Sequence, residues 1–236
     1  MNRFVLPISS AALAISMLPP ALADVAGVEI ARDYLMDRRE EIALSRSAGP
    51  EIVSRDATIL VLTASGDYET AVQGKNGWTC FTGRGWTGPA PIENGRRVWS
   101  QADHFDPGLR APQCFNALAS ESILEMHKLT TRLLMRGASP HDAETATAIA
   151  LQTGELTPPR AGAMSYMLSK DQLLSRAVGA FRPHLMLYTP FADSVSTYGG
   201  ADARVPTPPV TDPGTAWAVT VILWPVWSDG TPAPAM

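Results

Sequence analysis

The stretch ATILVLTASGDYETAVQGKNGWTCFTGRGW, residues 57–86, decides the fold that we predict for this chain. Residues 57–63 are rich in β-branched side chains and indicate a buried strand, and residues 68–73 alternate as a half-exposed strand. Asn76-Gly77 is typical of a type I′ hairpin turn, after which residues 78–82 would form the return strand. We therefore expect residues 57–82 to form a three-stranded antiparallel meander.

Helical periodicity marks three segments around this meander. Apolar residues recur at three- and four-residue steps in residues 25–46 and again in residues 118–136. The third helix starts at Ser139 as N-cap with Pro140 in its first turn, and Gly154 ends it. About three helices are therefore expected.

The C-terminal third returns to strand patterns, in residues 163–168, 183–190 and 217–224. We thus expect an α+β fold in a single domain, residues 24–236. Its antiparallel sheet would have about six strands, the meander plus three C-terminal strands, packed with the three helices. The tail, residues 228–236, is expected to be frayed.

The first residues have the pattern of an export signal. Arg3 precedes a mostly apolar run that ends at Pro19-Pro20, and Ala21-Leu22-Ala23 fits the small-residue cleavage rule. We expect residues 1–23 to be removed, leaving a periplasmic or secreted protein without a membrane span. The net charge of −4, with no basic run, argues against nucleic acid or an anionic membrane as a partner.

Two cysteines, Cys80 and Cys114, are expected to form a disulfide in an exported chain. A metal pair and a catalytic thiol are the competing interpretations. Residues 83–113 between them lack any period and predict a long loop, which the disulfide would hold as an ordered flap. In the chain-entropy model such a bridge constrains the unfolded state by about 3–4 kcal/mol.

Several segments together resemble a family of bacterial exported proteins. The resemblance covers the chain from about Ser47 to Pro232. The segments are SAGPEI and ATILVL near the start, GKNGWTCFTGRGW and APQCFN around the cysteines, and GAMSYMLSKDQ, PHLMLYTPF and PVWSDGTP in the C-terminal half. The resemblance implies export and carries over no catalytic residue.

The binding surface that we predict combines the loop with one strand. Arg84, Trp86 and Trp99 lie in or near the disulfide-bounded loop. In residues 183–190, His184 and Tyr188 share one strand face with a methionine, which could line a pocket. The competing interpretation is a core histidine with one bonded nitrogen.

Candidates for catalysis and metal binding are weaker. Ser165 or Ser169 can be combined with His184 and Asp193, but no GxSxG elbow is present. Asp103, His104 and Asp106 could bind a divalent cation, but no fourth ligand is identifiable, and a polar loop is the favoured interpretation, so no metal site is expected. The carboxylate pairs Asp33/Asp37 and Glu40/Glu41 lie among arginines, which is typical of a solvated helix face. No nucleotide or haem motif occurs, so no cofactor is expected.

These patterns favour a non-enzymatic exported module that binds a small molecule or a partner protein of the cell envelope. One alternative is a periplasmic hydrolase or metal-dependent enzyme that uses His184 or His104. The other is a structural protein associated with the envelope.

Overall fold

The computed structural model describes residues 32–85, 92–93, 96–97, 106–174, 179–193 and 210–234. The main strands are β1 (Thr58–Leu62), β2 (Tyr68–Val72), β3 (Thr79–Gly85), β6 (Asp106–Phe115), β7 (Met164–Met167), β8 (His184–Tyr188), β9 (Val210–Thr211) and β10 (Val219–Leu223), and a separate ribbon pairs β4 (Ile92–Glu93) with β5 (Arg96–Arg97). The helices are η1 (Arg32–Tyr34, 3-10), α1 (Arg38–Arg46), α2 (Glu51–Ser54), α3 (Ala117–Ser120), α4 (Ile123–Met135) and α5 (Pro140–Thr153).

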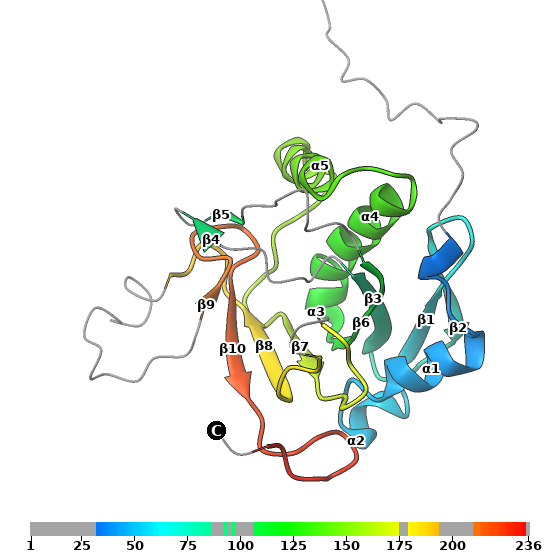
Figure 1. Ribbon diagram of the computed structural model, residues 1–236. Coiled ribbons are helices and arrows are strands. Elements are labelled where there is room, and N and C mark those ends of the chain that lie inside the picture. The colour runs from blue at the N-terminus through cyan, green and yellow to red at the C-terminus, as the bar shows by residue number, and fades with distance from the viewer. Residues whose placement is uncertain are drawn as a thin grey trace, which may run out of the picture.

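The α+β class is confirmed, and the sheet is larger and differently paired than predicted. Within the described residues it has eight strands in the order β2-β1-β3-β6-β7-β8-β10-β9 and spans the molecule (Figure 1). All neighbouring strands are antiparallel except β1 and β3, which are parallel. The sheet is therefore mixed, where the sequence predicted about six antiparallel strands.

The connection from β2 to β3 shows why the predicted meander is wrong. After β2 the chain passes the N-terminal end of β1 and forms β3 on the far side of β1. Lys75 N–H donates to the carbonyl of Asp56 at 2.9 Å, and Thr58 N–H donates to that of Trp78 at 2.8 Å. Gly77 has a positive φ of 77°, but Asn76 does not, so the segment is no type I′ turn.

Gly74 permits this passage because the backbones touch there. A Cβ built on Gly74 would lie 2.1 Å from the amide nitrogen of Thr58 and 2.3 Å from the carbonyl carbon of Ala57. No side chain fits at such distances, since glycine alone allows backbones to approach so closely. Gly74 therefore makes possible the close passage that places β3 on the far side of β1.

β3 and β6 form the central ladder of the sheet, with Cys80 directly opposite Cys114. The predicted disulfide between them is present, with a Cα–Cα distance of 4.0 Å and no exposed surface on either residue. The predicted loop, residues 83–113, is partly wrong. Its first residues belong to β3 and its last residues belong to β6, because the ladder runs well beyond the disulfide.

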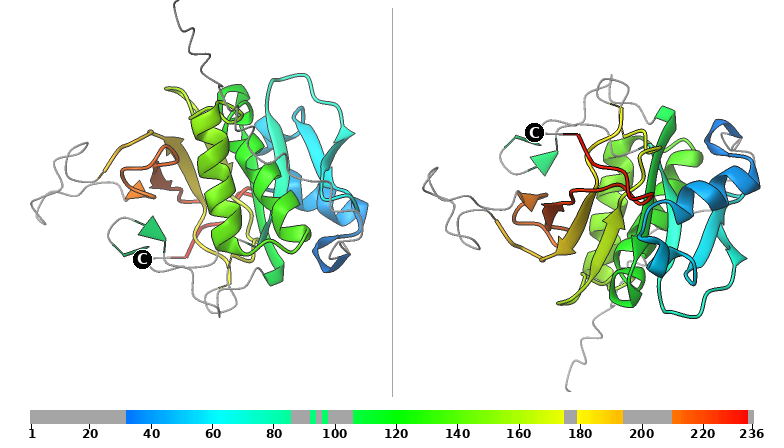
Figure 2. Two further views of the ribbon diagram at one scale, coloured as in Figure 1. Left: turned by 90° about the horizontal axis from the view of Figure 1, so that it is seen from above. Right: turned by 90° about the horizontal axis from the view of Figure 1, so that it is seen from below.

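The sheet lies between two layers of helices. Ile59, Cys80 and Cys114 pack with Ala48 and Ala57 on the face that carries α1. Residues of the opposite parity pack against α3 and α4 on the other face; they include Leu60, Phe81 and Phe115 with Ile123 and Leu124. There α4 and α5 lie side by side (Figure 2, left). This alternation is what a strand buried on both faces requires.

The helices agree with the sequence in part. Ser139 accepts a hydrogen bond from Asp142 N–H at the start of α5, and Gly154 ends that helix with φ 78°, both as predicted. The predicted helix over residues 118–136 is divided into α3 and α4. The predicted helix over residues 25–46 is also wrong as one unit, since Asp37 caps a new helix, α1.

The C-terminal tail was predicted to fray, and its described part, up to residue 234, is instead held in place. Ser228 N–H donates to the carbonyl of Leu168 at 2.9 Å, and Trp227 N–H donates to that of Thr231 at 2.8 Å. Lys170 Nζ lies 2.6 Å from Asp229 Oδ2. These contacts turn the tail back along the exit of β7.

Replacing Gly74 tests the passage. We expect Gly74→Ala to lower the free energy of unfolding by several kcal/mol, because its Cβ has no room beside Thr58. Gly77→Ala is the matched control, because its Cβ meets nothing within 4 Å. It should lower the free energy of unfolding only through the strain of a positive φ, by about 1–2 kcal/mol. Urea unfolding followed by circular dichroism measures both. Equal losses would contradict the role given to Gly74.

His127 predicts that the protein loses stability in acid. Its ring on α4 lies 5.3 Å from that of Phe81 and 5.7 Å from that of Phe115, and this burial lowers the pKa of His127 to about 3. Between pH 6.5 and that value the unfolded state binds the extra proton. The free energy of unfolding should therefore decrease as the pH decreases, by up to about 1.4 kcal/mol per pH unit.

His127→Phe should make this slope shallower, whereas Leu129→Ala, a change to a buried side chain without a titratable group on the same helix, should leave it unchanged. Comparing slopes between pH 6 and pH 4 removes any fixed packing difference of the variants. A His127→Phe protein with the wild-type slope would show that His127 is not responsible.

Candidate functional site

The sequence suggested that Arg84 lies at a binding surface, but Arg84 is fully buried. Its Nε donates to the carbonyl of Tyr34 at 2.6 Å, and its Nη1 donates to that of Thr82 at 2.6 Å. Its Nη2 donates to Glu41 Oε1 at 2.7 Å, and the same oxygen accepts the N–H of Leu62 at 3.1 Å. Glu41 is likewise buried, so its assignment to a solvated helix face was wrong.

The side chains of His184 and Tyr188, which share one strand face, are buried. His184 is 4% exposed; its Nδ1 lies 2.7 Å from the carbonyl of Arg182, and burial lowers its pKa. The Tyr188 hydroxyl lies 2.9 Å from Ser165 Oγ, and burial raises its pKa. The competing interpretation, a core histidine with one bonded nitrogen, describes His184 correctly.

The serine and histidine groups that a hydrolase would need are engaged elsewhere. The hydroxyl of Ser165 contacts Tyr188, and that of Ser169 lies 2.6 Å from Ser47 Oγ and accepts the N–H of Asp171. Nδ1 of His184 faces a backbone carbonyl. These hydrogen bonds therefore do not join Ser165 or Ser169 to His184, as a hydrolase would require.

Four predicted residues, Trp86, Trp99, Asp103 and His104, lie outside the described residues, and their roles stay predictions. Asp106 is described; it begins β6, where its Oδ1 accepts the N–H of Gly108 at 2.7 Å. Within the described part of the chain, no three His, Cys, Asp or Glu side chains come together in a way that would hold a metal ion.

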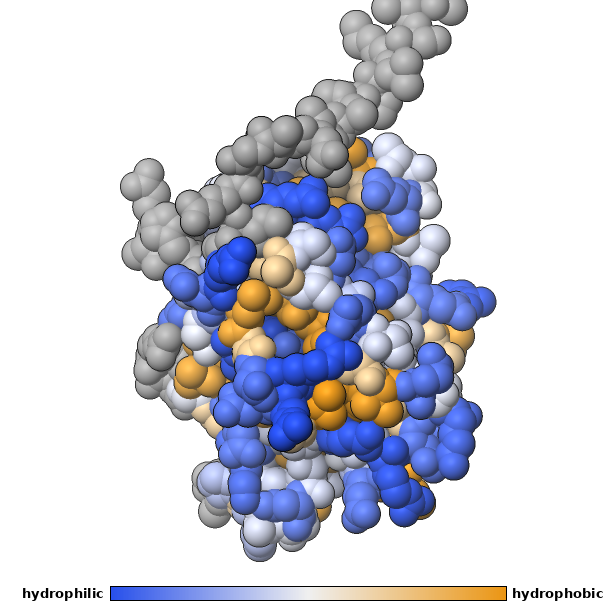
Figure 3. Space-filling view, turned by 90° about the vertical axis from the view of Figure 1, so that its right-hand side faces the viewer, coloured by the Kyte–Doolittle hydropathy of each residue, from blue (hydrophilic) through white to orange (hydrophobic). Residues whose placement is uncertain are grey.

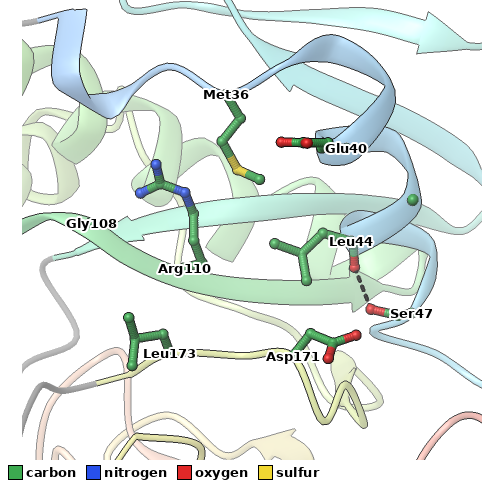
Figure 4. Close-up of a pocket in the computed structure, with 9 residues that line it drawn as sticks. Met36, Glu40, Leu44, Ser47, Gly108, Arg110, Asp171 and Leu173 are labelled. Carbon is green, nitrogen blue, oxygen red and sulfur yellow. Dashed lines mark hydrogen bonds between the residues drawn. The ribbon is translucent and has the colours of Figure 1, made fainter.

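A hollow of about 460 Å³ opens between α1 and β6, and we call it the α1–β6 hollow. Three separate segments line it: α1 with its flanks, β6, and the chain after β7 (Figure 4). The lining residues are Met36, Glu40, Ala43, Leu44, Ser47, Gly108, Arg110, Asp171 and Leu173. Figure 3 shows that apolar residues gather in two areas on the face that carries α1 and β2, with hydrophilic residues between them.

The helix period explains why α1 can line a hollow and cover the sheet at once. Glu40, Leu44 and Ser47 recur at four- and three-residue steps and form one stripe along the hollow. Glu41 and Ser45, each one position further along, point to the sheet, where Ser45 Oγ lies 2.9 Å from Thr82 Oγ1. One face of α1 therefore lines the hollow, and the neighbouring face packs on the sheet.

Arg110 brings a cation into the hollow. It lies directly opposite Arg84 in the β3–β6 ladder, on the face that carries α1. Burial and the charge of Arg84 lower the pKa of Arg110 to about 10, so the guanidinium stays charged at neutral pH. Its Nη1 donates to the carbonyls of Leu109, at 2.7 Å, and Pro107.

The third wall is fixed to β6 by backbone hydrogen bonds. Arg110 N–H donates to the carbonyl of Leu173 at 2.8 Å, and Leu173 N–H donates to that of Arg110 at 2.9 Å. Ser47 Oγ, which donates to the carbonyl of Leu44 at 2.7 Å, also contacts Ser169. These contacts hold the three walls in position, as expected for a largely pre-formed site.

Comparison with known proteins adds no functional assignment. No protein-family model, no curated protein and no solved structure matches the chain. The resemblance to bacterial exported proteins therefore stays a prediction. No helix in the described ranges is both long and apolar enough to span a bilayer.

Sequence reasoning missed most of this hollow. It singled out Arg84 but not Arg110, because only the strand register places the two arginines opposite each other. One signal was available: Arg110 lies between apolar residues, four positions before Cys114, a spacing that puts both side chains on one strand face.

The buried ion pair can be tested by replacing its two members singly and together. Arg84→Met should lower the free energy of unfolding by about 3–5 kcal/mol, because Glu41 is left charged and unpaired in the interior. The double variant Arg84→Met/Glu41→Leu should be more stable than Arg84→Met alone. Urea unfolding gives the comparison, and simple additivity of the single losses would contradict the pairing.

Proposed function

We propose that this protein is an exported module that binds a small molecule in the α1–β6 hollow. The observation that carries the proposal is a half-buried guanidinium, that of Arg110, inside a concavity with apolar walls. Pockets for small ligands have volumes of about 300–1,000 Å³ and combine apolar lining with a few polar groups that orient the ligand. The α1–β6 hollow, at about 460 Å³, has both properties.

Export rests on two features of the chain. The first is the signal-like pattern of residues 1–23. The second is the disulfide between Cys80 and Cys114, because disulfides persist in oxidising compartments such as the periplasm and the extracellular space. Together they favour a periplasmic or secreted protein.

Binding is favoured over catalysis because of what surrounds the polar groups of the hollow. Ser47 has the hydroxyl in the hollow that could act as a nucleophile, but it is hydrogen-bonded to Leu44 and Ser169 rather than to a histidine. Arg110 remains protonated and has no role as a proton acceptor. A small molecule also fits the concave site better than a flat protein surface would.

Filling the hollow should abolish binding. Any compound that a thermal-shift screen of metabolites, peptides and glycans identifies should raise the unfolding temperature of the wild type, since it binds the folded state. Leu44→Trp and Leu173→Trp, which occupy the hollow from opposite walls, should weaken its affinity at least about tenfold, or about 1.4 kcal/mol.

Ile52→Trp on α2 is the matched control, because Ile52 is 78% exposed and does not line the hollow. Its affinity, measured by titration calorimetry, should equal that of the wild type. A ligand that binds all three variants equally would place the site elsewhere and overturn the proposal.

A further inference from the structure

The charges of the α1–β6 hollow are separated, with a cation inside and carboxylates at the mouth. Arg110 is half-buried on the floor, whereas Glu40 and Asp171 are exposed. In Figure 4 Glu40 lies above Leu44 and Asp171 lies below it, and the guanidinium of Arg110 lies across the hollow from Asp171. A ligand that extends from Arg110 toward Asp171 would meet opposite charges at its two ends.

The floor of the hollow brings two guanidinium groups together. Arg84 and Arg110 lie opposite each other, and the charges of Glu41 and Asp106 each oppose the lowering of the pKa of Arg110. One oxygen of Glu41 already accepts from Arg84 and from Leu62 N–H. Among the described residues, no ion pair links Arg110 to a carboxylate. A ligand carboxylate would compensate Arg110, and a guanidinium binds that group through parallel N–H donors.

The mouth carries two carboxylates. Glu40 lies in the first turn of α1 and Asp171 lies in the chain after β7, and neither takes part in an ion pair within the described ranges. These two charges repel a ligand that is only anionic, and they attract an ammonium group. Because both are solvated, each contributes modestly to affinity and mainly to selectivity.

Between the two charged regions the walls are apolar. Met36 and Leu44 come from the α1 side, and Leu173 comes from the opposite wall. Burying an aliphatic or aromatic group against these side chains contributes roughly 25 cal/mol per Å² of apolar surface. The ligand therefore needs an apolar body that separates its charges.

We propose that the α1–β6 hollow binds a zwitterion with an apolar body, the chemistry of a short peptide or a free amino acid with large apolar side chains. Its carboxylate contacts Arg110, its ammonium lies near Glu40 and Asp171, and its side chains contact Met36, Leu44 and Leu173. This inference rests on the proposed binding function of the same hollow. It explains why one site contains both signs of charge.

A matched set of dipeptides tests the two charges separately. The probes are Leu-Phe, N-acetyl-Leu-Phe, which lacks the ammonium, and Leu-Phe amide, which lacks the carboxylate. Titration calorimetry at low ionic strength should show that Leu-Phe binds at least about tenfold more tightly than the amide. The preference over the acetylated peptide should be smaller, about threefold, because the carboxylates are solvated.

Variants should remove these preferences one at a time. Arg110→Gln should abolish the preference for Leu-Phe over its amide, while Arg110→Lys should retain it in part. The double variant Glu40→Gln/Asp171→Asn should abolish the preference over the acetylated peptide. Because Arg110 also donates to backbone carbonyls, unfolding curves should accompany its variants; the other pair is exposed and keeps the test independent of folding.

The outcomes separate this inference from the proposed function. Equal affinity of the three dipeptides, abolished by Leu44→Trp, would overturn the zwitterion and leave the hollow as a binding site. If none of the three dipeptides binds, and another compound from the screen binds the wild type but not Leu44→Trp, the zwitterion is likewise overturned and the hollow remains a binding site. A dipeptide whose affinity is unchanged in both Leu44→Trp and Leu173→Trp would overturn both.

Discussion

The fold depends on one buried ion pair, between Glu41 of α1 and Arg84 of β3. Through it four segments meet: the end of η1 at Tyr34, α1, β1 at Leu62, and β3. Taking two charges out of water is costly, and an apolar replacement is often as stable. What the pair supplies is position, because each donor and acceptor is satisfied in only one arrangement of the helix over the sheet. Three of the four buried hydrogen bonds of Arg84 and Glu41 join groups far apart in sequence, and the fourth joins Arg84 to Thr82.

The α1–β6 hollow follows from the same pair. Since α1 is fixed with Glu41 toward Arg84, its neighbouring stripe with Leu44 must border the space above β6. The ladder then brings Arg110 opposite Arg84, so two guanidinium groups lie near the buried carboxylate of Glu41. Like charges directly opposite in a sheet are unfavourable. The core therefore tolerates Arg110 best when the hollow offers it solvent or an anion.

Local patterns predicted the elements, and nonlocal contacts decided how they pair. The β-branched run in residues 58–62 became β1, Ser139 and Gly154 bound α5, and Cys80 joins Cys114, each as expected. The partner of β3 could not be predicted, because Asn76-Gly77 reports only local backbone geometry and not which side of β1 the chain reaches. The burial of Glu41 was also hidden, since its partner, Arg84, is recognisable only in three dimensions.

The disulfide divides the β3–β6 hairpin into two parts, and this division affects which sequence changes the protein can accept in evolution. Cys80 and Cys114 close the ladder near the centre of the sheet, so everything between them forms one covalent ring. Lengthening a closed loop costs little, roughly 0.6 kcal/mol for each doubling, and that cost does not reach the strands outside the ring. Apart from Arg84, which the buried ion pair needs, the distal half of the hairpin, which carries Arg110, can thus accept insertions and substitutions while the rest of the sheet keeps its register. Selectivity can diversify there without refolding the scaffold.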